Sequence, residues 1–248
     1  MVVINQILNF FFGENFPEIN QILIFFPVLL VYVFFVLESA ERFRQKWNWK
    51  VGYTRKFFHF LIFGMAGMMQ YWQGIGGVFI LGWAVTLWIV YILWKENDTK
   101  YYSLLGRPKD APHVSRYIVY PYLATFLGGV VNNLFFPPIS TIAGYLVAGL
   151  GDAAGEPAGT KWGRHQYPVF NWGSKVKSYR SLEGSLAVFL VCMIAFALPM
   201  YFYGFVIEWH KIAIAALVAA IVEGISPHGW DNFTSQITGA ILMSYFLL

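Results

Sequence analysis

Long apolar runs dominate the chain, and short polar stretches with Gly, Pro or charged residues separate them. Each run covers about 17 to 22 residues, which is enough for one α-helix to cross the hydrocarbon core of a bilayer. The runs and turn signals predict about eight membrane-spanning helices, near residues 20–37, 57–72, 74–94, 116–136, 138–158, 182–204, 208–226 and 231–248. The two predicted helices that meet at Gly74 have an alternative interpretation as one long kinked helix. The expected fold is an all-α, polytopic membrane bundle that forms one domain over residues 1–248.

The basic residues indicate how these helices are oriented. They follow the first, third and fifth predicted helices, so that every Lys and Arg except Lys211 falls on one face of an eight-helix arrangement. The positive-inside rule makes that face cytosolic and places both termini on the opposite side. The expected cytosolic loops lie near residues 38–56, 95–115, 159–181 and 227–230. No Lys or Arg precedes Arg42, so the first helix is expected to be retained rather than cleaved as a signal peptide.

Composition excludes several classes of protein. The 248 residues are 58% hydrophobic and only 12% charged, whereas soluble domains carry roughly a quarter charged residues. The net charge of +4 lies on no soluble module, so we expect no nucleic acid as a partner and instead expect membrane lipids or a phosphate-bearing substrate. The single cysteine, Cys192, excludes an intrachain disulfide and a cysteine-based metal site.

Function is expected from polar residues held at membrane depth, because such residues are costly there. Four polar segments reach the same predicted cytosolic side. The first is RKFFH, in which Arg55 and His59 stand four residues apart and share a helix face. They are placed to present a cation and an imidazole to one ligand. The alternative is that Arg55 and Lys56 are ordinary flanking charges and that His59 has no role.

The second segment is GDAAGEPAGTKWGRH, which follows a run too short to span a bilayer by itself. The helix is therefore expected to continue through Asp152 and Glu156, two carboxylates on one face that need a cation or a proton between them. Oxygen ligands of this kind suit magnesium beside a phosphate. The spaced glycines Gly151, Gly155 and Gly159 belong to the expected site, although close helix packing is the alternative explanation for them.

The third segment is KVKSYRSLEGS. Three cations, Lys175, Lys177 and Arg180, precede Ser181, the expected N-cap of the next helix. Basic side chains and free backbone N–H groups at a helix start are suited to phosphates. We expect Glu183 and Gly184 to help, with Glu183 near a metal or a ribose hydroxyl. The alternative is a solvated basic loop.

The fourth segment is EGISPHGWDN. Glu223 is a lone carboxylate on an apolar helix, so it is expected to face the bundle interior or water rather than lipid. Asp231 and Asn232 begin the last helix, and N-capping is the alternative role for one of them.

The four segments, taken in order, resemble the CTP-dependent polyprenol kinases, a family that includes dolichol kinase and phytol kinase and looks related to phosphatidate cytidylyltransferase. The likeness runs from Arg55 to Asn232, and the acidic Glu156 looks more like the phytol-kinase branch. Two positions depart from the family pattern: Gly155 replaces a usual alanine, and Arg180 stands where lysine is common. The Pro-Lys-Arg signature of the cytidylyltransferases, with its spaced Asp and Arg, is absent.

The resemblance implies transfer of the γ-phosphoryl group of CTP to the hydroxyl of an isoprenoid alcohol such as phytol, farnesol, geranylgeraniol or a polyprenol. It implies Mg²⁺ on Asp152, with Glu156 or Asp231, and a base chosen from Glu223, Asp231 and His59. The residues expected at the nucleotide are Lys161, Arg164, Lys175, Lys177, Arg180, Ser181, Glu183 and Gly184. The flanking positions expected to support the site are Arg55, Lys56, Gly151, Gly155, Gly159 and Asn232.

Two other functions remain open from sequence. One is a lipid-CDP synthase of the cytidylyltransferase type. The other is a membrane transporter, which would be expected to show inverted repeats and charges near the bilayer midplane rather than at one interface. The expected location is a bacterial or archaeal plasma membrane or an organelle membrane, with the active face toward the cytosol.

Overall fold

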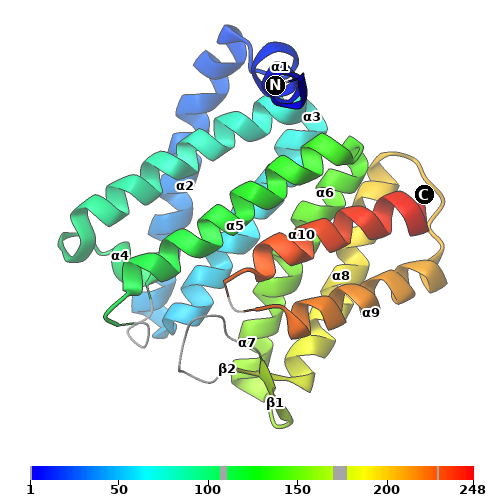
Figure 1. The fold of residues 1–248 in the computed structure, drawn as a ribbon. Coiled ribbons are helices and arrows are strands. Elements are labelled where there is room, and N and C mark those ends of the chain that lie inside the picture. Colours follow the sequence, from blue (N-terminus) through cyan, green and yellow to red (C-terminus); the bar gives the residue numbers. More distant parts are fainter. Residues whose placement is uncertain (1, 107–110, 170–177, 228) are drawn as a thin grey trace.

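The structure is a computed structural model that describes residues 2–106, 111–169, 178–227 and 229–248. Helices make up nearly all of this part of the chain (Figure 1). In order they are α1 (Val2–Asn9), η1 (Phe10–Glu14), α2 (Ile19–Trp47), α3 (Val51–Lys95), η2 (Glu96–Asp98), α4 (Tyr102–Leu105), α5 (Val114–Phe135), α6 (Pro138–Leu146), η4 (Val147–Gly151), α7 (Asp152–Trp162), α8 (Leu182–Phe202), α9 (Trp209–Ile225), α10 (Asp231–Leu242) and η5 (Met243–Leu247). The strands β1 (Gln166–Val169) and β2 (Ser178–Ser181) pair antiparallel between α7 and α8.

The all-α prediction is confirmed for the described residues, apart from this short hairpin. Helical residues occupy every range that the apolar pattern predicted. Four helices, α2, α3, α5 and α8, are long and apolar enough to cross a membrane. The helix α9 has 17 residues, and single π-helical turns interrupt the last helix and the one that contains α6 and α7. The structure is therefore compatible with a membrane, while the number of eight spans stays a prediction.

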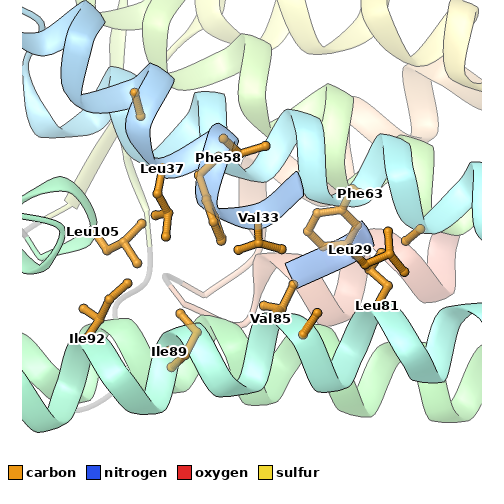
Figure 2. Close-up of a cluster of buried hydrophobic side chains, with 14 of the residues drawn as sticks. Leu29, Val33, Leu37, Phe58, Phe63, Leu81, Val85, Ile89, Ile92 and Leu105 are labelled. Carbon is orange, nitrogen blue, oxygen red and sulfur yellow. The ribbon is translucent and has the colours of Figure 1, made fainter. Parts of the chain in front are cut away.

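The segment Val51–Lys95 consists of two helical limbs that reverse direction at Gly74. Gly74 has φ 63° and ψ −154°, a left-handed backbone conformation that favours glycine. Figure 2 shows Phe58 and Phe63 on one limb opposite Val85 and Leu81 on the other, in opposite order. The prediction of two helices at this point is confirmed, and the alternative of one long kinked helix is wrong.

A first apolar core joins α2 to both limbs of α3. The α2 side chains Leu29, Val33 and Leu37 are almost completely buried and lie between the limbs (Figure 2). Large apolar side chains such as Leu23 point away from this core and are exposed. Lipid provides no hydrophobic driving force between helices, so this core is stabilised mainly by close packing of the side chains.

A second core joins α6, α8, α9 and α10, and it is rich in small residues. The face of α9 that packs inward carries Ala215, Ala216, Ala219 and Ala220. Where α6 crosses α10, a Cβ atom on Gly239 would lie 2.9 Å from the Cα atom of Gly144, so the two backbones need these glycines to approach. Small residues at helix crossings are typical of membrane proteins.

The predicted loop boundaries need correction. The expected loop at 38–56 is mostly helical, because α2 continues to Trp47 and α3 begins at Val51. The sequence LESAERFRQK contains strong helix formers and no Gly or Pro, so the helix extends past its apolar part. The expected loop at 95–115 likewise contains η2 and α4, and α7 extends into the expected loop at 159–181.

Candidate functional site

Three buried carboxylates from three separate helices meet at one point. Asp152 begins α7, Glu223 lies in the last turn of α9, and Asp231 begins α10. Their ligand oxygens all lie within 4.8 Å of one another. The prediction that Glu223 faces the interior is confirmed, since the residue is only 6% exposed. We call Asp152, Glu223 and Asp231 the carboxylate triad.

Two cations from the start of α3 compensate the carboxylates on α7. The Lys56 ammonium forms an ion pair with Asp152 and lies 3.7 Å from Glu156 Oε2. Arg55 Nη2 lies 3.2 Å from the same Glu156 oxygen. The prediction that Asp152 and Glu156 share a face with a cation between them is confirmed. Arg55 and Lys56 are buried, so their interpretation as ordinary flanking charges is wrong.

Arg180 compensates the other side of the triad. It lies on β2, and its Nη2 atom is 3.0 Å from Glu223 Oε1 and 3.2 Å from Asp231 Oδ2. Burial lowers the pKa of Arg180, but the nearby carboxylates raise it more, so its pKa lies above the usual value and the group stays charged. Among the described residues, no hydrogen-bond partner reaches its buried Nη1 atom. That N–H donor is suited to a phosphate oxygen.

The donor set suits a hard divalent cation. It consists of carboxylate oxygens. Among the described residues, the triad and Glu156 supply four carboxylates, and the cations paired with them are three: Arg55, Lys56 and Arg180. Magnesium typically binds one or two carboxylates together with substrate phosphates. The sequence placed Glu156 beside Asp152 and Asp231 as a ligand, whereas the geometry brings Glu223 into the triad and leaves Glu156 against Arg55. The residues fit Mg²⁺, and its presence stays a prediction.

His59 and Asn232 join the first and fourth segments. Asn232 Nδ2 lies 3.0 Å from His59 Nε2 and 3.0 Å from Thr125 Oγ1 on α5. His59 Nδ1 lies 3.1 Å from the carbonyl oxygen of Arg55, so both ring nitrogens are engaged. N-capping does not explain Asn232, because its side chain reaches across to α3 and α5. Asp231 Oδ1 accepts a local hydrogen bond from the Asn232 N–H at 3.1 Å.

The third segment is described only in part. Ser181 caps α8 as predicted, since its Oγ accepts the Gly184 N–H at 3.1 Å. Glu183 Oε1 lies 2.8 Å from His165 Nδ1. The roles expected for Glu183 and Gly184 at a ligand stay predictions. Lys175 and Lys177 lie outside the described residues.

Two further basic residues expected at the nucleotide, Lys161 and Arg164, are exposed near the end of α7. The Lys161 ammonium lies 4.9 Å from the centre of the Trp162 ring. Within the described part of the chain, neither residue contacts the triad, and their role at a nucleotide stays a prediction.

The glycines of α7 let this helix approach α8. If Gly151, Gly155 and Gly159 carried Cβ atoms, these would lie 2.9 Å from Cys192 Sγ, 2.8 Å from Val188 Cγ2 and 2.9 Å from Ser181 Oγ, respectively. The packing explanation for these glycines is therefore confirmed. The close approach brings Ser181, at the end of β2, against Gly159 in the second half of α7, and the guanidinium of the preceding Arg180 reaches Glu223 and Asp231 of the triad.

Sequence reasoning missed two contributors to the site. Gly52 lies at the start of α3, where a Cβ atom would be 2.7 Å from Glu156 Oε1, so glycine makes room for this carboxylate. Thr125 lies in the middle of a predicted membrane helix, and its hydroxyl accepts a hydrogen bond from the Asn232 side chain. No local sequence pattern distinguishes either residue.

An apolar pocket lies beside His59. Its walls come from both limbs of α3, from α4 and from α5. Arg55 and His59 form its polar part, and its other walls are mainly aliphatic and aromatic, including Phe58, Ile62 and Tyr122. The pocket therefore adjoins the polar site and extends along membrane helices.

Comparison with known proteins adds one relative. A phytol kinase from Synechocystis sp. is 30% identical to this chain over 125 residues, which are 49% of this chain and 51% of the relative. The chain thus spans about half the length of the curated relative that it matches. No family model matches, and no solved structure matches. The similarity supports a family that is polyprenol- or phytol-kinase-like at most.

Proposed function

We propose that this protein is a membrane-bound kinase that transfers the γ-phosphoryl group of CTP to the hydroxyl of an isoprenoid alcohol, giving the isoprenyl phosphate and CDP. The observation that carries the proposal is the convergence of the carboxylate triad with Lys56 and Arg180, drawn from all four segments that resemble the polyprenol kinases. The similarity to a protein named phytol kinase supports an isoprenoid alcohol as the acceptor.

The geometry suits phosphoryl transfer, which requires positioning and charge neutralisation more than covalent chemistry. Asp152, Glu223 and Asp231 would hold Mg²⁺, which neutralises phosphate charge when bound. Arg180 donates from Nη1 to the transferring group and stays anchored through Nη2 on Glu223 and Asp231. Lys56 holds Asp152 in place and adds positive charge next to it.

A carboxylate of the triad accepts the proton of the alcohol in this mechanism. Glu223 and Asp231 are the candidates, because Asp152 is held in its ion pair with Lys56. If one of the two accepts the proton, Asp152 and the other carboxylate would hold Mg²⁺. His59 has both ring nitrogens in hydrogen bonds, one to the Arg55 carbonyl and one to Asn232. We therefore give His59 the role of positioning Asn232 beside the alcohol rather than that of the base.

We further propose eight membrane spans, with the site at the cytosolic face and both termini on the opposite face. The positive-inside pattern supports this topology. In Figure 1 the N-terminus lies at the top and the C-terminus at the right, whereas α4 lies at the left and α7 and the β hairpin lie toward the bottom. CTP then reaches the site from the cytosol, and the alcohol reaches it from the bilayer.

The position of the triad also favours a kinase over a transporter. Asp231 begins α10 and Glu223 lies in the last turn of α9, so two of the three carboxylates lie at helix ends, whereas Asp152 lies inside the helix that continues from α6 through η4 into α7. Transporters bind their substrates near the bilayer midplane. A lipid-CDP synthase is disfavoured by the missing Pro-Lys-Arg signature.

The test uses purified protein in lipid nanodiscs with γ-labelled CTP, ATP, GTP and UTP, and with farnesol, geranylgeraniol, phytol and a polyprenol as acceptors. We expect labelled isoprenyl phosphate, with CTP as the preferred donor, and less than about a tenth of wild-type transfer by Asp152→Asn. Phosphatidate is included as a further acceptor, and release of pyrophosphate with formation of a CDP-lipid from it would instead identify a cytidylyltransferase. A complete lack of transfer with every pair would reject the proposal.

A further inference from the structure

The pocket beside His59 has the features of a lipid-tail site. Its α5 wall extends from Tyr117 to Thr125, which is about 12 Å along a helix. Ile62, Val85 and Ile89 form apolar walls from the two limbs of α3. Arg55 supplies a charged side chain and His59 a titratable imidazole to the wall, Tyr117, Tyr122 and Thr125 add hydroxyl groups, and the other lining side chains are apolar.

The pocket and the carboxylate triad share a wall. His59 lines the pocket, and its Nε2 atom contacts Asn232, which directly follows Asp231 of the triad. Arg55 lines the pocket as well, and its guanidinium contacts Glu156 on α7. One layer of side chains therefore separates the apolar pocket from the polar site. A molecule with a long apolar part and one reactive end fits across that layer.

We propose that the pocket between α3, α4 and α5 binds the first isoprene units of the acceptor alcohol, with the hydroxyl at the His59 end. This inference rests on the proposed kinase function and names the place of its lipid substrate. The His59–Asn232 pair orients the hydroxyl toward the triad, and the rest of the chain extends into the bilayer. The aromatic and branched walls suit a methyl-branched chain, because apolar pockets discriminate by shape.

The first test measures the kinetics of Ile62→Trp, a substitution that narrows the pocket. Ile62 is only partly buried, so the larger ring is expected to enter the pocket without disrupting a closed core. We expect the KM for geranylgeraniol to rise about tenfold or more, with the KM for CTP within about twofold of wild type. The matched control is Ile194→Trp on α8, where the side chain is 56% exposed and lies outside the pocket. The control is expected to keep wild-type kinetics.

A second measurement does not depend on turnover. A diazirine analogue of geranylgeraniol is photolysed with wild-type protein in nanodiscs, and the adducts are mapped by mass spectrometry. We expect adducts on residues 55–63 and 117–125, displaced by excess geranylgeraniol and reduced in Ile62→Trp but not in Ile194→Trp. A diazirine phosphatidylcholine is the comparison probe for ordinary membrane lipid.

The outcomes separate the two proposals. If kinase activity is present but Ile62→Trp changes neither KM nor labelling, the pocket assignment is wrong while the kinase remains. If no alcohol is phosphorylated and the adducts still map to the pocket, the kinase is rejected and the pocket stands as a prenyl-chain site. Equal labelling by phosphatidylcholine, with no displacement by geranylgeraniol, would make the pocket a site for bulk lipid and overturn the inference.

Discussion

The ion pair between Lys56 and Asp152 offers the most direct test of the site's electrostatics. Both side chains are almost fully buried, with exposed fractions of 5% and 6%. Replacing Lys56 by Met keeps much of the side-chain volume and removes the charge. Asp152 is then left without its closest cation, and Glu156 loses the Lys56 ammonium while its contact with Arg55 remains.

The expected cost follows from burial and distance. Removing one partner of a buried ion pair typically costs about 3–5 kcal/mol, because the remaining charge has been taken out of water without compensation. For the second contact, 3.7 Å to Glu156, Coulomb's law at an effective dielectric constant near 20 gives about 4.5 kcal/mol. Because the Glu156 side chain is partly exposed, water screens this second interaction and lowers its contribution. We therefore expect Lys56→Met to reduce the free energy of unfolding by about 3 kcal/mol or more.

The assay is unfolding in mixed micelles, followed by the fluorescence of the 10 tryptophans, for Lys56→Met, Asp152→Asn and the double variant. The double variant is expected to recover part of the loss, because the neutral amide needs no counter-charge. The control is Lys100→Met, whose ammonium lies 2.8 Å from Glu38 and is 44% exposed. Exposed pairs contribute at most about 1 kcal/mol.

Two results would refute this reasoning. One is a coupling energy between Lys56 and Asp152 below about 0.5 kcal/mol, the size at which two positions behave independently. The other is a loss in Lys56→Met as small as that in Lys100→Met. Either result would mean that water or another group solvates the buried carboxylate.

The other predictions concern catalysis and topology. Asp152→Asn is expected to keep less than about a tenth of wild-type turnover, a change of ~1.4 kcal/mol in the barrier, while remaining folded in detergent; higher activity would give Asp152 a structural role. Arg180→Ala should raise the KM for CTP and lower kcat, whereas Glu223→Gln should act mainly on kcat. Kinetics with CTP and alcohol varied separately test this, and the opposite split would refute both assignments. A cysteine near Lys175 should be labelled from the cytosolic side and one near Gly13 from the opposite side, and labelling of both from one side would refute the eight-span arrangement.

Local patterns were sufficient to predict the helices and the polar segments of the site. Apolar run length and turn residues predicted the helical ranges, because each depends on neighbours along the chain. The same holds for Ser181, whose cap interacts with Gly184 three residues later. The helix through Asp152 and Glu156 was also predictable, since the preceding apolar run is too short to cross a bilayer alone.

The sequence by itself thus determined an all-α, membrane-compatible chain with four polar segments, whereas only the tertiary structure decided how those segments pair. Lys56 meets Asp152 across 96 positions, and His59 meets Asn232 across 173. Glu223 joins the triad while Glu156 turns to Arg55 and Gly52, a distinction that depends on the rotation of each helix about its axis. That rotation results from the packing of small residues and core side chains between helices, which no local pattern encodes.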